Sequence, residues 1–205
     1  MAGRNIRELS REIAGCRICI ERPDGKPLPH APRPVAILSA TARIAICGQA
    51  PGVRVHASGK PFTDPSGDRL RQWMGVSDDE FYDAGRIAIV PMGFCFPGLD
   101  GKGSDLPPRR ECAPVWRARI FAEMPQVELM LLVGIYAQRW HLRNRVKPTL
   151  TGTVAAWESL TTSGAVPRML PLPHPSWRNN GWIRKNQWFA RELLPFLQQR
   201  VRELL

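Results

Sequence analysis

Four short apolar runs, separated by segments long enough to form helices, constrain the fold of this chain most strongly. Short, continuously apolar runs are typical of strands buried on both faces, and strands that alternate with helices form a mainly parallel sheet covered on both sides. The length suits one substantial core, so we expect a single α/β domain over residues 1–205. The expected strands span residues 43–47, 86–91, 127–134 and 168–173, and the expected helices span residues 4–15, 66–75, 110–123, 135–142, 153–161 and 186–204.

Three segments rich in glycine, proline and polar residues directly follow these apolar runs. They read GQAPG from Gly48, MGFCFPG from Met92 and HPSWRNN from His174. Ligand sites of open parallel sheets gather beyond the C-terminal ends of the strands. The sequence therefore predicts that these three segments meet at one functional site.

The charge of the chain indicates a polyanionic partner. There are 29 Lys and Arg residues against 18 Asp and Glu residues, so the formal net charge is +11 and the sequence pI is about 10.3. Nucleic acid is the commonest polyanion for a domain this basic, and a merely basic protein is the alternative. No apolar run reaches the roughly 18 residues of a membrane span, and the first residues lack an apolar secretory region. We expect a cytoplasmic protein with no membrane contact.

The five cysteines do not suggest a disulfide framework, because their number is odd and no secretory leader precedes them. Cys16 and Cys19 form a C-x-x-C pair, which is a common two-ligand arrangement on one metal centre. Cys95 and Cys112 form a second, distant pair. The four thiols could hold zinc or a [4Fe–4S] cluster, or could be ordinary reduced cysteines. Cys47 lies within an apolar run and is expected to pack as a small hydrophobe.

His174 stands between Pro173 and Pro175, which restrict the backbone on both sides. Hydrogen-bonding side chains follow it closely, so the histidine is a candidate functional group; a structural role is the alternative. In the first loop, Gly48 and Gly52 would let backbone amides approach a ligand closely.

The order of GQAPG, SGKPF and HPS along the chain resembles the uracil-DNA glycosylase superfamily. The cysteine spacing is most similar to its bacterial and archaeal iron–sulfur branches, families 4 and 5, and the likeness extends from the C-x-x-C pair to the last helix. It implies a three-layer α/β/α sandwich with a central, mostly parallel four-stranded sheet. It also implies a [4Fe–4S] cluster, with zinc as the alternative, at Cys16, Cys19, Cys95 and Cys112.

The resemblance further implies an activity and its residues. Members of this superfamily flip a damaged base out of DNA and hydrolyse its N-glycosidic bond. Gln49 and Ala50 take places next to the base, with Gln49 also near the attacking water. Phe62 matches the aromatic residue that stacks on the flipped base. His174 matches the histidine that donates to a uracil carbonyl oxygen as the base departs.

Two carboxylates of the family motifs are missing here. Family 1 carries an aspartate where Ala50 stands, and family 4 carries a glutamate where Gln49 stands. Family 5 carries a downstream aspartate in a segment like FTGD-x-SG, which FTDPSGD approximates with one residue fewer. We therefore expect Asp64 to orient or activate water, with Asp68 and His56 behind it. A helix N-cap is the alternative role for Asp64.

The family also reads uracil with an asparagine a few residues before the third cysteine, and the segment VPMGFC has none. Backbone groups near Met92 and Gly93 could replace part of that contact. Uracil is the first expectation, and another deaminated base is the alternative.

Basic and polar residues near the motifs are expected to contact DNA. Trp177 takes the place of the family's DNA-intercalating residue, and Ser176 and Asn179 are expected to hold the loop or to grip phosphates. Phosphate contacts set position and salt dependence more than sequence choice. The expected phosphate-binding cations are Lys102, Arg109, Arg110 and Arg178.

Two hypotheses follow for the whole chain. The first is a monofunctional, monomeric DNA glycosylase that works at the bacterial nucleoid and starts base excision repair, because no lysine occupies a nucleophile position in the motifs. The second is a non-catalytic protein that binds damaged DNA and keeps the base pocket, which the missing carboxylates favour.

Overall fold

The computed structural model describes residues 2–162 and 164–205, and its strands form a four-stranded sheet in the order β2-β1-β3-β4. Every neighbouring pair of strands is parallel, and each strand lies within one of the predicted apolar runs. The prediction of an α/β fold with a central four-stranded parallel sheet is confirmed. The strands are β1 (Ile44–Cys47), β2 (Ile87–Ile89), β3 (Leu129–Val133) and β4 (Arg168–Leu172).

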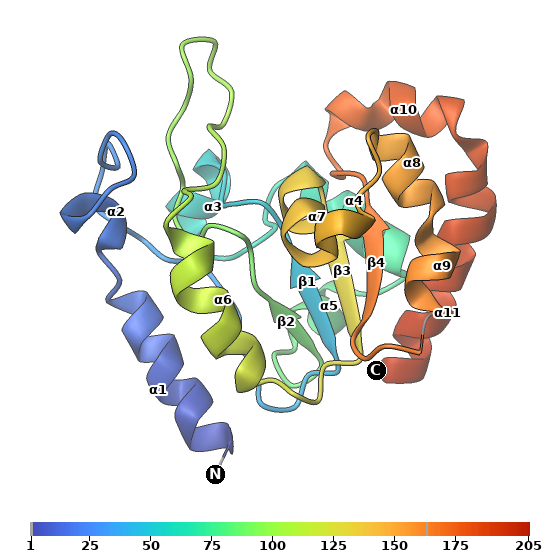
Figure 1. The fold of residues 1–205 in the computed structure, drawn as a ribbon, viewed down its shortest axis with the longest axis horizontal. Helices are drawn as coiled ribbons and strands as arrows, with labels where there is room; N and C mark the ends of the chain where they lie inside the picture. Colours follow the sequence, from blue (N-terminus) through green and yellow to red (C-terminus); the bar gives the residue numbers. More distant parts are fainter. Residues whose placement is uncertain (1, 163) are drawn as a thin grey trace.

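One face of the sheet packs against the N-terminal helix and two helices from the middle of the chain (Figure 1). Ala45 and Cys47 point to this face, because side chains alternate along a strand. The N-terminal helix contributes the apolar stripe of Ile6, Leu9 and Ile13 that its sequence predicts. The helices of this layer are α1 (Ala2–Ala14), α6 (Cys112–Ala122) and α7 (Ile135–Leu142).

The opposite face carries Ile44 and Ile46 from β1 and is covered by helices from the rest of the chain. The two helical layers enclose the sheet, which gives the α/β/α sandwich (Figure 1). Among the described residues, no helix combines the length and the apolar character that crossing a membrane demands. The helices of this layer are α4 (Pro65–Met74), α5 (Asp78–Tyr82), α8 (Leu150–Ala155), α9 (Trp157–Thr161), η3 (Phe189–Leu193) and α11 (Leu194–Leu204).

Short helices are the main difference from the sequence-based expectation. A helix of one or two turns is too short to display the 3.6-residue apolar period on which the prediction depends. The unpredicted helix α5 does have a readable start signal, because Ser77 and Glu80 form a capping box. The remaining unpredicted elements are α2 (Ile18–Glu21), α3 (Val53–Ser58), η1 (Arg143–Arg145), η2 (Trp177–Asn179) and α10 (Asn180–Lys185).

Candidate active site and cysteine cluster

A cavity of about 320 Å³ lies at the C-terminal edge of the sheet, where the segments after β1, β2 and β4 meet. Its size falls within the range of small-molecule sites. Five residues that the sequence assigned to the site line this one cavity: Gln49, Ala50, Phe62, Asp64 and His174. The fold thus brings together side chains that are up to 125 positions apart in the chain.

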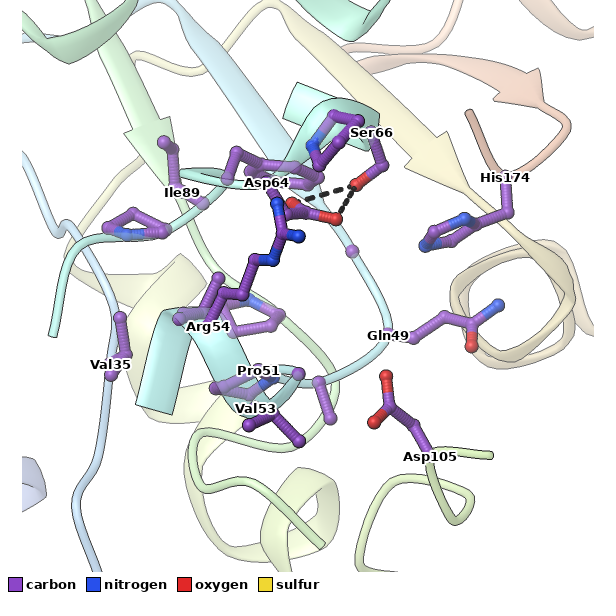
Figure 2. Close-up of a pocket in the computed structure, with 18 of the residues that line it drawn as sticks. Val35, Gln49, Pro51, Val53, Arg54, Asp64, Ser66, Ile89, Asp105 and His174 are labelled. Atoms are coloured by element: carbon purple, nitrogen blue, oxygen red, sulfur yellow. Dashed lines mark hydrogen bonds between the residues drawn. The ribbon is translucent and has the colours of Figure 1, made fainter. Parts of the chain in front are cut away.

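The loop around His174 presents a neutral imidazole to the cavity (Figure 2). Burial lowers the pKa of His174, an effect that Asp64 opposes and Arg178 reinforces. The backbone N–H of Ser176 donates to Nδ1 at 3.2 Å. Because Nδ1 accepts that bond, the proton of the neutral ring is on Nε2, which is a hydrogen-bond donor.

Side chains on both sides of this loop hold it in place. Asn179 donates from Nδ2 to the carbonyl oxygen of His174 at 2.7 Å. Arg69 of α4 donates to the carbonyl oxygen of Ser176 at 3.2 Å and to Oδ1 of Asn180 at 2.8 Å. Asn179 and Ser176 therefore fix the loop, which was one of their two predicted roles. Trp177, between them, is 73% exposed.

Phe62 is fixed at the cavity wall by an unusual backbone conformation. Its φ angle is 56°, in the left-handed region that is costly for a bulky residue. Its carbonyl oxygen accepts hydrogen bonds from Tyr82 Oη at 3.1 Å and from Arg71 Nη1 at 3.3 Å. The ring meets Phe81 edge-on, with centroids 5.9 Å apart. These contacts compensate the strain and hold the ring beside the loop at Gly48, where an added Cβ would come within 3.3 Å of it.

Asp64 occupies the N-cap position of α4, yet its side chain does not cap the helix backbone. The carboxylate instead accepts the Ser66 hydroxyl, at 3.0 Å and 2.8 Å to its two oxygens. The expected supporting residues lie elsewhere: Asp68 forms an ion pair with Arg71, and the His56 ring packs against another histidine. Neither Asp68 nor His56 lines the cavity.

Two cavity residues were missed by the sequence reasoning. Arg54 of α3 extends across the cavity, and Asp105 approaches it from the loop between β2 and α6 (Figure 2). Burial raises the pKa of Asp105; Arg178 lowers it and Asp64 raises it. No local motif marks either residue, because only the fold brings their segments to the cavity.

The side chain of Gln49 lies close to Gly134: a Cβ added at Gly134 would lie 2.5 Å from Nε2 of Gln49.

The structure corrects the expectation for Met92 and Gly93. Neither residue lines the cavity. The backbone N–H of Met92 donates to the carbonyl oxygen of Gly48, and that of Gly93 donates to the carbonyl oxygen of Gln49, both at 2.9 Å. These two N–H groups tie the second loop to the first.

A buried arginine supports the floor of the cavity. Arg117 of α6 is 1% exposed and donates to the carbonyl oxygens of Val90 and Pro91 at 3.2 Å and 3.0 Å. It also donates to Cys47 Sγ and to His141 Nε2, each at 3.0 Å. Burial, and then the charge of Arg117, lower the pKa of His141 to about 3. The arginine thereby fixes the ends of β1 and β2, from which two cavity loops begin.

A family model described as the uracil DNA glycosylase superfamily matches residues 36–198. The chain belongs to this superfamily. The family membership supports a DNA glycosylase role in DNA repair, on DNA with damaged bases. Among solved structures, the chain is similar to that of wild-type SMUG2 from Pedobacter heparinus, with 12% sequence identity, a TM-score of 0.41, and coverage of 78% of this chain and 76% of that one.

In this uracil-DNA glycosylase superfamily member, the four expected cysteine ligands line one small enclosed cavity, apart from the base cavity. Burial is the largest cause that raises the pKa of three thiols, to about 11 for Cys19 and about 12 for Cys95 and Cys112. The backbone groups of Arg33 and Phe94 partly oppose the rise in the pKa of Cys95 and of Cys112, respectively.

The donor set fits an iron–sulfur cluster in number and chemistry, because four soft sulfur donors face one apolar cavity. The free space between the thiols is about 10 Å³, so a cluster would require the side chains to turn outward. Within residues 2–162 and 164–205, no group of three or more His, Cys, Asp or Glu side chains is arranged to hold a single metal ion.

The expected DNA-binding cations divide into two groups. Lys102, Arg110 and Arg178 are exposed. Arg109 is not available to phosphates: it pairs with Glu111 at 2.6 Å, with both side chains largely buried, and donates to a backbone carbonyl oxygen at 2.8 Å. Its guanidinium instead fixes the loop beside the cysteines in this structure.

Proposed function

We propose that this protein is a monofunctional DNA glycosylase that flips uracil, or a related deaminated base, out of DNA and hydrolyses its N-glycosidic bond. The observation that carries the proposal is the shared cavity of Phe62 and His174, whose neutral ring has an Nε2–H donor with no acceptor among the described residues. A flipped base would stack on the ring and direct a carbonyl oxygen toward the imidazole.

The arrangement suits the departure of an anionic base. When the glycosidic bond breaks, its electron pair passes to the base, and negative charge develops on the carbonyl oxygen. His174 is held by Asn179 and by the Ser176 N–H, so its donor needs no reorganisation in the transition state. Asp64 and Gln49 are the residues that the sequence offers for orienting water. No lysine lines the cavity in the described part of the chain, which favours hydrolysis without strand cleavage.

The surface around the cavity suits DNA. The exposed Trp177 ring follows His174 directly and offers a flat face for a base or a base step. Lys102, Arg110 and Arg178 would contact phosphates, in line with the net charge of +11.

The cysteine cavity is proposed to hold a [4Fe–4S] cluster through Cys16, Cys19, Cys95 and Cys112. When bound, the cluster would act structurally, by joining the segment after α1 to the segments before and at the start of α6. Iron and sulfide analysis of protein purified without oxygen tests this assignment. Zinc without iron would contradict it and leave the glycosylase proposal standing.

The decisive experiment uses oligonucleotides with a single uracil, hypoxanthine or xanthine, followed by alkali and measurement of strand scission. His174→Ala is expected to lower the excision rate on the order of 10²–10³-fold while DNA affinity is kept. His30→Ala, a histidine outside the cavity, is the matched control. Excision that is equal in the two variants would remove His174 from the mechanism.

A second function has support from the absence of carboxylates at Gln49 and Ala50. On this view the protein binds damaged DNA through the same cavity without hydrolysis. Tight binding of all three damaged oligonucleotides, with no scission of any, would favour it over the glycosylase proposal.

A further inference from the structure

We propose that Asp105 supplies the carboxylate that the first loop lacks, and that it takes the proton of the water attacking C1′ of the flipped nucleotide. This inference rests on the proposed glycosylase function and adds a catalytic residue to it.

The position of Asp105 beside the first loop is the starting observation. Its Oδ2 lies 3.0 Å from the point that a Cβ on Gly52 would occupy. Gly52 is two residues after Ala50, the place where family 1 carries its aspartate. A carboxylate from another segment therefore reaches the loop from which the motif carboxylate is missing, and the bare glycine leaves room for it.

The loop that carries Asp105 is held in a defined shape (Figure 1, between β2 and α6). Leu99 and Asp105 form an antiparallel bridge, and the N–H of Leu106 donates to the carbonyl oxygen of Gly98 at 2.9 Å. Arg178 from the His174 loop donates to Ser104 Oγ at 3.0 Å. This bond joins the loop of Asp105 to the loop of His174, and both residues line the same cavity.

The two cavity carboxylates differ in their hydrogen bonds. Both oxygens of Asp64 face the Ser66 hydroxyl. Among the described residues, the Asp105 carboxylate has no hydrogen-bond donor and no ion-pair partner, so its oxygens are available to water or substrate. Figure 2 shows it directed toward the side of the cavity that holds Gln49.

Asp64 and Asp105 also differ in how deep they lie in the cavity. A flipped nucleotide remains joined to its phosphates, so its base enters deepest and its sugar stays near the entrance. Asp64 is partly buried next to Phe62, whereas Asp105 is more exposed and lies at the cavity mouth. A group that acts on C1′ belongs at the mouth, which favours Asp105 for the water and leaves Asp64 near the base.

The step balances with the groups present. The water oxygen forms a bond to C1′ as the C1′–N bond breaks, and the electron pair of that bond leaves with the base. The water proton passes to the Asp105 carboxylate and then to solvent. The base anion, stabilised by His174, takes a proton from solvent. Partial burial raises the pKa of Asp105, which makes its carboxylate a stronger base than an ordinary aspartate.

Asp105→Asn tests the proposal, because it keeps the shape and removes the base. Single-turnover excision should fall on the order of 10²–10⁴-fold. Affinity for an oligonucleotide with 2′-fluoro-2′-deoxyuridine, which resists hydrolysis, should stay within about threefold, since a general base contributes little to ground-state binding. Asp100→Asn on the same loop is the control: its carboxylate accepts two backbone N–H groups, which an asparagine oxygen can also accept.

The outcomes separate this inference from the proposed function. Wild-type protein that excises no base would overturn both. Wild-type excision with an unchanged Asp105→Asn rate would overturn the inference alone, as would a loss confined to Asp64→Asn. Equal losses of rate and affinity in Asp105→Asn would make Asp105 a binding residue and also overturn it. An acidic limb in the wild-type pH–rate profile that is absent from the variant would support it.

Discussion

Gly67 holds the strained conformation of Phe62, and replacing it by alanine should disturb both stability and base binding. Gly67 is buried in the first turn of α4, where an added Cβ would lie 1.9 Å from the carbonyl oxygen of Phe62. Contacts of Cβ atoms essentially never fall below 3.0 Å, so either the helix or the Phe62 backbone must move by more than 1 Å.

The expected losses of stability and of DNA affinity follow from these two possible movements. Overpacking of this kind costs about 1–3 kcal/mol, and the helix-forming advantage of alanine over glycine offsets about 0.5–1 kcal/mol of it. For a chain of this size each kcal/mol corresponds to about 2–4 °C in Tm. If Phe62 moves instead, the flipped base loses a stacking contact of about 1–3 kcal/mol, equal to roughly 5- to 150-fold in Kd.

Thermal unfolding and Kd for the 2′-fluoro oligonucleotide measure the two effects of Gly67→Ala. Gly181→Ala is the matched control, because Gly181 also lies in a helix, α10, and an added Cβ there meets nothing within 4 Å. The control should keep or slightly raise Tm. If both variants behave alike in Tm and in Kd, the close approach of Gly67 to Phe62 is not what fixes the ring.

Three further predictions concern pH, the cysteines and DNA. Because burial and Arg117 lower the pKa of folded His141 to about 3, the unfolded state binds more protons below about pH 6.5. The free energy of unfolding measured in urea should therefore fall as the pH is lowered from about 6.5 toward 3, and His141→Gln should lessen this slope by up to about 1.4 kcal/mol per pH unit; an unchanged slope would contradict this. Cys16→Ser should lower bound iron and Tm together; full iron content would exclude that ligand. Trp177→Ala should weaken uracil-DNA binding about 5- to 100-fold in fluorescence anisotropy, and unchanged affinity would place Trp177 outside the DNA interface.

The sequence predicts the sheet well and the short helices poorly, for a physical reason. Strands buried on both faces must be apolar throughout, so runs such as residues 127–134 mark them directly. A helix such as α3 has six residues and little more than one turn of pattern. Its contribution to the cavity, Arg54, depends on the fold rather than on any local signal.

The site residues also differ in how well the sequence predicts their positions. His174 and Phe62 lie in motifs whose local rigidity is visible in the sequence, through flanking prolines in one case and SGKPF in the other. Met92 and Gly93 were assigned from their place before Cys95, but the register of their backbone N–H groups depends on tertiary pairing with the first loop. Such pairing leaves no trace in a single sequence.

The position of a catalytic carboxylate is the least predictable feature, and the cavity explains why. A histidine that meets developing charge must be preorganised, so its loop needs proline flanks and an asparagine tether. A carboxylate that acts on water needs only to reach the entrance with free oxygens, and many segments around the rim could carry it. Replacement of the motif acid by Ala50 therefore does not by itself imply loss of hydrolysis. The sharper criterion is whether some acid lines the same cavity without a hydrogen-bond or ion-pair partner, and within residues 2–162 and 164–205 Asp105 meets it.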